Sequence, residues 1–123
     1  MPKVYIVSKG YHDWSAAERF GKIIFLARDQ MERTSVSFML RTFIPKMRGS
    51  KPDDFIVVTG LTVMCVIAAA IFVLKHKRLN LLLWNAPKGD YEQRLIPFDD
   101  IELEKNPKGS MYYAMVKASE DER

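Results

Sequence analysis

Basic, aromatic and amide side chains occur near the ends of the hydrophobic runs of this chain, and together they could bind a flat, anionic ligand. An aromatic ring gives a purine a surface to stack on, and guanidinium or amide groups donate hydrogen bonds to an anion. Each residue also suits an ordinary structural role; Trp84, for example, equally suits a core or an interface. We predict a ligand-binding site made of Lys9, Tyr11, His12, Arg28, Trp84, Asn85 and Arg94.

Residue types that serve catalysis and metal binding are few and badly spaced. His12 and His76 are the only histidines and Cys65 is the only cysteine, so no zinc-ligand spacing occurs. Asp13 and Ser15 cannot form a triad with His12 by proximity in sequence, because consecutive side chains point in different directions, and helix capping explains both. We therefore expect no catalytic residue, no metal and no cofactor.

The common glycine-rich phosphate-binding motifs do not occur in the sequence. Thr59-Gly60, between a predicted strand and a predicted helix, could still present backbone N–H groups to a phosphate. The alternative is that Gly60 only permits a tight turn.

Length and composition favour one small cytoplasmic domain. The chain has 123 residues and a formal net charge of +4, which suits an anionic ligand as well as nucleic acid. A single cysteine excludes an intramolecular disulfide and fits a reducing compartment, and the first residues lack the apolar core of a signal peptide. We expect a compact α/β domain over residues 1–118 and a disordered tail over residues 119–123.

The uncharged run over residues 55–74 could cross a membrane or fold as two elements. Residues 55–58 are β-branched and aromatic and end at Thr59-Gly60, which is typical of a buried strand at a turn. Residues 61–75 favour a helix of about 22 Å, shorter than a hydrocarbon layer of about 30 Å. We therefore predict a strand followed by a helix and no membrane contact; the alternative is a single membrane span.

The remaining pattern predicts an α/β (α+β) fold, with a small mixed sheet of about five or six strands and two main helices, one of them fully apolar. A capping box from Ser15 to Glu18 should start a short helix that stops at Gly21, and Pro45 should kink or end the first part of another. Further strands are expected over residues 4–7, 22–27, 79–85 and 91–98, with weaker candidates over 101–103 and 111–116.

The apolar helix over residues 61–74 also predicts self-association. A helix that is apolar on all sides must be covered on all sides, and one sheet and one other helix can cover only part of it. We therefore expect a dimer or a higher homo-oligomer, in which a second subunit covers the rest.

Four segments make the chain resemble a group of short phage and prophage proteins. They are VYIVS near the start, AERFGKIIFL over residues 17–26, PDDFIVVTG over residues 52–60 and RLNLLLW over residues 78–84. Within that group the chain most resembles the phage anti-Thoeris sponges. The resemblance implies sequestration of a cyclic ADP-ribose isomer, or a related cyclic nucleotide, that serves as an immune signal in the host cytoplasm. The resemblance covers roughly residues 3–100. It does not identify individual binding residues of this chain.

Binding without turnover fits the absence of an evident nucleophile or metal ligand set. Several charge-assisted contacts and burial of a base could reach an affinity of about 1 nM, which corresponds to about −12 kcal/mol. The alternative is a small phage module that binds nucleic acid or a host protein, although we do not expect nucleic acid as the partner.

Overall fold

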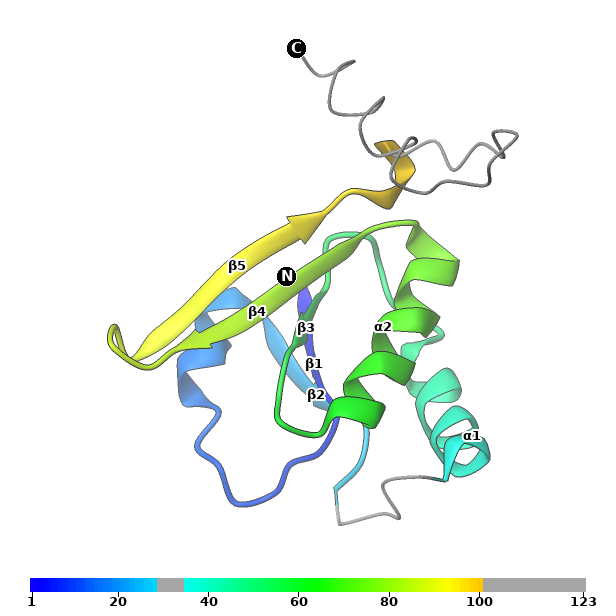
Figure 1. The fold of residues 1–123 in the computed structure, drawn as a ribbon, viewed down its shortest axis with the longest axis horizontal. Helices are drawn as coiled ribbons and strands as arrows, with labels where there is room; N and C mark the ends of the chain where they lie inside the picture. The colour runs from blue at the N-terminus through cyan, green and yellow to red at the C-terminus, as the bar shows by residue number, and fades with distance from the viewer. Residues whose placement is uncertain (29–34, 101–123) are drawn as a thin grey trace, which may run out of the picture.

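A computed structural model describes residues 1–28 and 35–100 of the chain. Figure 1 shows two α-helices packed together on one side of a twisted sheet. Along the chain the elements are β1 (Lys3–Ile6), the 3-10 helix η1 (Ser15–Phe20), β2 (Lys22–Phe25), α1 (Val36–Met47), β3 (Phe55–Val57), α2 (Thr62–His76), β4 (Leu79–Asn85), β5 (Asp90–Ile96) and the 3-10 turn η2 (Phe98–Asp100).

The five strands form one mixed sheet in the order β2-β1-β3-β4-β5. The first four are parallel, and β5 returns antiparallel to β4 through a tight hairpin. Parallel neighbours need a crossover, and η1, α1 and α2 occur between successive parallel strands. The predicted fold class, a small mixed sheet with two main helices, is confirmed. The candidate strands after residue 100 lie outside the described residues.

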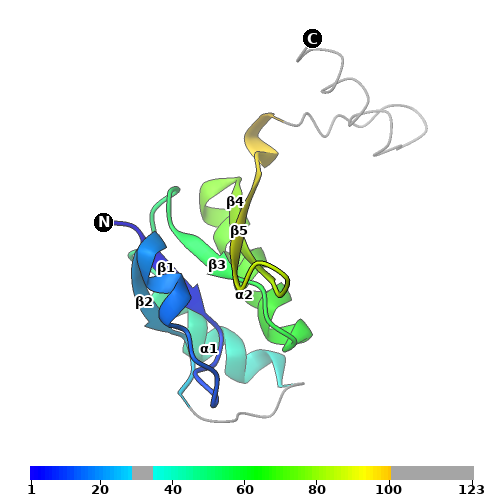
Figure 2. The ribbon, with the colours of Figure 1, turned by 90° about the vertical axis from the view of Figure 1, so that its left-hand side faces the viewer.

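Side chains alternate between two hydrophobic cores on the two faces of the sheet, as the twofold repeat of a strand requires. Tyr5, Ile24 and Ile56 point to the face covered by α1 and α2, whereas Val4, Ile23 and Val57 point to the face covered by η1. Figure 2 shows η1 on the opposite side of the sheet from α1. The parallel strands are therefore apolar on both faces, which explains their continuous hydrophobic runs.

The uncharged central run is divided between β3 and α2, as predicted from its change of composition. Thr59 marks the turn: its Oγ1 accepts a hydrogen bond from the Leu61 N–H at 3.2 Å and lies 3.3 Å from the Cys65 sulfur. Among the residues that the structure describes, no helix is both long and apolar enough to cross a membrane.

Helix α2 keeps one apolar stripe exposed. Met64, Ala68 and Phe72 are buried against the sheet and α1, whereas Val66 is 59% exposed and Leu74 is 84% exposed. One sheet and one helix therefore leave part of this apolar helix uncovered in a single chain, as the sequence argument anticipated.

The start of η1 differs from the predicted capping box. Ser15 is the first residue of the helix and makes no capping bond; instead the carboxylate of Asp13 accepts the Ser15 N–H at 2.9 Å. The helix ends at Gly21 as predicted, but for a steric reason. A Cβ at Gly21 would lie 2.1 Å from the Pro2 carbonyl oxygen, so only glycine allows the close approach in which Lys22 N–H bonds to that oxygen.

Pro45 does not end α1. The helix continues through it to Met47, because a proline near the end of a helix removes only one hydrogen bond from the last turn. Met39, Phe43 and Met47 form the buried row of the helix, whereas Leu40 is 36% exposed.

A buried carboxylate joins the N-terminal ends of β1 and β3. Asp54 is 1% exposed, and its two oxygens accept the Lys3 N–H at 2.9 Å and the Lys51 N–H at 2.8 Å. Asn80, at the start of β4, donates its amide to the carbonyls of Pro52 and Asp54. These bonds join the N-terminal ends of β1, β3 and β4, at the edge of the sheet opposite the pocket.

Candidate ligand pocket

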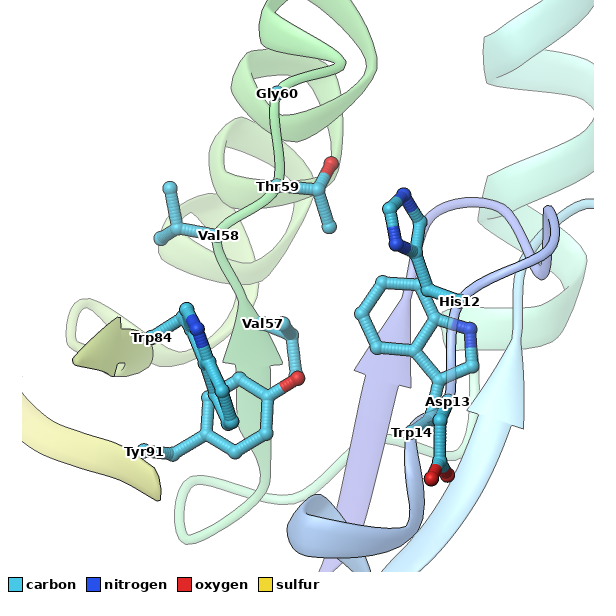
Figure 3. Close-up of a pocket in the computed structure, with 9 residues that line it drawn as sticks. All are labelled: His12, Asp13, Trp14, Val57, Val58, Thr59, Gly60, Trp84 and Tyr91. Carbon is cyan, nitrogen blue, oxygen red and sulfur yellow. The ribbon is translucent and has the colours of Figure 1, made fainter. Parts of the chain in front are cut away.

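A cavity of about 420 Å³ opens beyond the carboxyl ends of β1 and β3. The chain runs from β1 outward to β2 and then crosses back to β3 on the other side of β1, so this is where the strand order reverses. Open sheets of this kind bind ligands at such a switch point. Its volume lies within the range of small-molecule sites. The lining, shown in Figure 3, consists of His12, Asp13, Trp14, Val57, Val58, Thr59, Gly60, Trp84 and Tyr91.

One wall of the pocket is a pair of aromatic rings from the hairpin. Trp84 on β4 and Tyr91 on β5 are paired across the two strands, and their rings meet edge to face with centroids 5.0 Å apart. Tyr91 is buried with Val57 and Leu82 in the hydrophobic core on the η1 face of the sheet, the η1-side core. Trp84 is 52% exposed, so a ligand can reach its ring. Burial, and then the nearby negative charge of Asp13, raise the pKa of the Tyr91 hydroxyl.

The opposite wall comes from the loop between β1 and η1. His12 and Trp14 stack edge to face at 5.5 Å, and the Trp14 indole donates its Nε1–H to the Lys9 carbonyl at 2.7 Å. That bond fixes the indole relative to the end of β1. In Figure 3 the two aromatic pairs face each other across the cavity, and Val57 lies between them at the end of β3.

The turn from β3 into α2 forms the end of the pocket that is uppermost in Figure 3, called the upper end below. Thr59 and Gly60 precede the first helical residue, Thr62, so the N-terminus of α2 faces this end. A helix N-terminus carries unpaired N–H groups and a partial positive charge, which favour an anion. A Cβ at Gly60 would meet nothing within 4 Å, so glycine is not required here by close packing.

The carboxylate of Asp13 gives the described pocket lining a negative charge. Asp13 is the only acidic residue in the lining, and no lysine or arginine of the described chain lines the cavity. The Ser15 N–H, and then the Ser15 hydroxyl, lower the pKa of Asp13. The group is therefore ionised at neutral pH. The described residues contain no cluster of His, Cys, Asp and Glu that could hold a metal ion.

Comparison with known protein families gives a match over most of the chain. Residues 2–98 match the family model described as "Phage Pam3 gp32-like protein". The chain belongs to this phage family. The matched range contains β1 to β5 and every residue that lines the pocket. No curated protein matches the chain, and no solved structure matches it.

Two of the seven predicted site residues of this Pam3 gp32-like chain, His12 and Trp84, line the pocket. Lys9, Tyr11 and Arg28 lie at the same edge of the sheet but outside the lining. The Lys9 N–H bonds to the Ala27 carbonyl at 3.1 Å, so Lys9 and Arg28 sit at neighbouring strand ends. Tyr11 is fully exposed.

Asn85 and Arg94 lie away from the cavity. The Asn85 amide donates to Glu92 at 2.6 Å, and Arg94 forms an ion pair with Glu92 at 2.7 Å. Successive side chains of β5 alternate between faces, so Glu92 and Arg94 project on the face opposite Tyr91. Arg94 is therefore not directed toward the pocket that Tyr91 lines.

Sequence reasoning did not select Trp14, Asp13 or Tyr91 as site residues. The capping role predicted for Asp13 describes its local hydrogen bond to Ser15 but not its place in the pocket lining. A signal for Tyr91 was present. A tight turn over residues 86–89 places Asn85 opposite Asp90 on the two strands of the hairpin. The next pair along the strands is Trp84 and Tyr91, so a turn at this position predicts that Tyr91 lies beside Trp84.

Proposed function

We propose that this phage-family protein binds a cyclic nucleotide immune signal, such as a cyclic ADP-ribose isomer or a cyclic oligonucleotide, and holds it without converting it. The pocket with two opposed aromatic walls is the observation that supports this most directly. A nucleobase is flat and needs a ring on which to stack, and Trp84 and Trp14 offer rings on opposite sides of the cavity. We place its action in the host cytoplasm.

The base would supply much of the binding free energy. Stacking of one base on an aromatic side chain contributes about 1–3 kcal/mol. The Tyr91 hydroxyl, which has no described protein partner, can bond to a base edge. A pocket formed before binding reduces the entropy lost when the ligand is ordered, which favours tight sequestration.

The phosphates would lie outside the aromatic walls. The N-terminus of α2 adjoins the upper end of the cavity, and Lys9 and Arg28 follow neighbouring strands at the same edge of the sheet. Both features attract anions, whereas Asp13 repels them. The arrangement therefore favours a ligand whose base enters the cavity and whose phosphates stay at the rim.

A second copy of the chain would cover the exposed stripe of α2, giving a homodimer. Lys75 and Lys77 lie at or just beyond the C-terminal end of α2, and neither α2 nor α1 contains an acidic residue. A twofold pairing with antiparallel α2 helices separates these cationic ends by about the helix length, roughly 22 Å. Parallel pairing would place them together and is disfavoured by repulsion.

Calorimetry with a cyclic ADP-ribose isomer tests the proposal. We expect tight binding with one site per chain, and recovery of the intact nucleotide after the complex is denatured by heat. A steady loss of ligand would instead indicate an enzyme. Absence of binding to any cyclic nucleotide, together with salt-sensitive binding to DNA or RNA, would favour the alternative of a nucleic-acid-binding module.

A further inference from the structure

The aromatic pocket is unusual for a nucleotide site in the sign of its charge. Four of its nine lining residues carry aromatic rings: His12, Trp14, Trp84 and Tyr91. The one ionised side chain in the described lining is the carboxylate of Asp13, and the anion-attracting groups lie at the rim. The group that enters the cavity therefore lies between aromatic rings and near the negative charge of Asp13. Burial, and then this charge, raise the pKa of the Tyr91 hydroxyl.

Ring faces and a carboxylate attract the same kind of ligand group. The face of an aromatic ring carries partial negative charge and attracts a cation within about 6 Å of its centre, most strongly for tryptophan. Asp13 adds a negative charge at the exposed edge of the cavity, where its carboxylate accepts the Ser15 N–H at 2.9 Å. An anion at the same position would be repelled by Asp13 and would find no cationic side chain among the described lining residues.

The shape of the cavity favours a flat group over a compact ammonium. Trp84 and Tyr91 form one wall, and His12 and Trp14 form the other, so the rings face each other across a gap (Figure 3). The end of β3 closes the gap with Val57, whose apolar side chain offers no hydrogen bond. A planar ring that enters this gap has one aromatic pair on each side of it.

We propose that the pocket selects a planar heteroaromatic ring that carries a positive charge, such as a pyridinium or an N-alkylated purine, over the uncharged form of the same ring. This inference rests on the proposed function, because it specifies the charge of the base held in the same pocket. Phosphates of such a ligand remain at the rim beside the α2 N-terminus.

Nicotinamide and its ring-N-methylated cation form a matched pair of probes, because they differ by one methyl group and one charge. Titrations of the full chain should show that the cation binds about 5- to 30-fold more tightly, as expected from cation–π contact with a partly desolvated site. In Asp13→Asn this preference should shrink several-fold, because the negative charge near the bound cation is removed. Asparagine keeps the side-chain oxygen that accepts the Ser15 N–H, so the loop retains its anchor.

Parallel titration with a cyclic ADP-ribose isomer separates this inference from the proposed function. Binding of the cyclic nucleotide without a preference for the cationic probe overturns only the charge selectivity. Preference for the cation without binding of any cyclic nucleotide overturns only the proposed function. Equal affinities for the two probes, or no binding of either up to its solubility limit, would refute the inference.

Discussion

Trp84 and Tyr91 stand opposite each other on the β4–β5 hairpin, with their ring centroids 5.0 Å apart and their planes inclined by 68°. The pair forms one wall of the pocket. Tyr91 is buried in the hydrophobic core on the η1 face of the sheet, and its ring packs against the ring of Trp84. A residue on the antiparallel edge of the sheet thereby contributes to a cavity at the ends of the central parallel strands.

Replacing Trp84 with alanine should weaken nucleotide binding while sparing the fold. Loss of one stacking face should cost about 1–3 kcal/mol, or about a 5- to 150-fold rise in Kd by calorimetry. Tyr11→Ala is the matched control, since it removes an aromatic ring from the same edge of the sheet but outside the cavity. If both variants lose affinity equally, the ligand does not use the pocket wall described here.

Asp54→Ala should lower the free energy of unfolding by about 2–3 kcal/mol, as measured by urea denaturation. The change removes a buried carboxylate and leaves the Lys3 and Lys51 N–H groups without their acceptor. Asp53→Ala removes a neighbouring exposed carboxylate and should change stability by less than about 0.5 kcal/mol. Similar losses in the two variants would show that the effect comes from net charge rather than from these bonds.

His76 should make stability depend on pH. Burial, and then the charge of Lys75, lower the pKa of His76 from its usual 6.5, although Asp54 and Ser50 oppose the shift. The unfolded chain then binds this proton more tightly than the folded chain, so protonation favours unfolding. The stabilising contribution is present above pH 6.5 and is lost as the pH falls through the lowered folded-state pKa.

His76→Gln isolates this effect, because glutamine can still hydrogen-bond to Ser50, whose hydroxyl oxygen lies 2.8 Å from the His76 Nε2. Urea midpoints measured from pH 7.5 down to 5.5 should fall more steeply for the natural chain than for the variant. Equal slopes, or an NMR titration that places the pKa of His76 at or above 6.5, would be inconsistent with the packing described.

Val66→Asp should abolish self-association if the exposed stripe of α2 is the dimer interface. Val66 is 59% exposed near the middle of the helix, so aspartate costs the single chain little but places a charge in the apolar contact. Light scattering should give a dimer for the natural chain and a monomer near 14.2 kDa for the variant. Leu95→Asp, at an exposed leucine on β5, should remain dimeric. A natural chain that is monomeric at high concentration would refute the pairing.

The sequence predicted most of the elements because their hydrophobic patterns are strong. The change from β-branched residues to alanines on either side of Thr59-Gly60 correctly divided the central run into β3 and α2. Helix ends were harder to predict. The S-x-x-E spacing suggested a capping box at Ser15, in which the Glu18 side chain would accept the Ser15 N–H, but the Asp13 carboxylate accepts that N–H instead.

The pocket was only partly predictable, because it depends on which strands become neighbours. His12 and Trp84 are separated by most of the chain and meet only because β4 lies beside β3 and β3 beside β1. Arg94 was selected for its chemistry, but the hairpin register places it on the face opposite Tyr91. Residue type suggested which side chains could bind a ligand, whereas strand order and register determine which of them line the cavity.

Tryptophan fluorescence tests the central claim most directly, because the chain contains two tryptophans, Trp14 and Trp84, and both line the pocket. Titration with a cyclic ADP-ribose isomer should change the emission in a saturable manner. Trp14→Phe and Trp84→Phe should each retain part of that change, since each leaves one indole at the ligand. Calorimetric binding that leaves the emission of both indoles unchanged would place the ligand elsewhere and contradict the account.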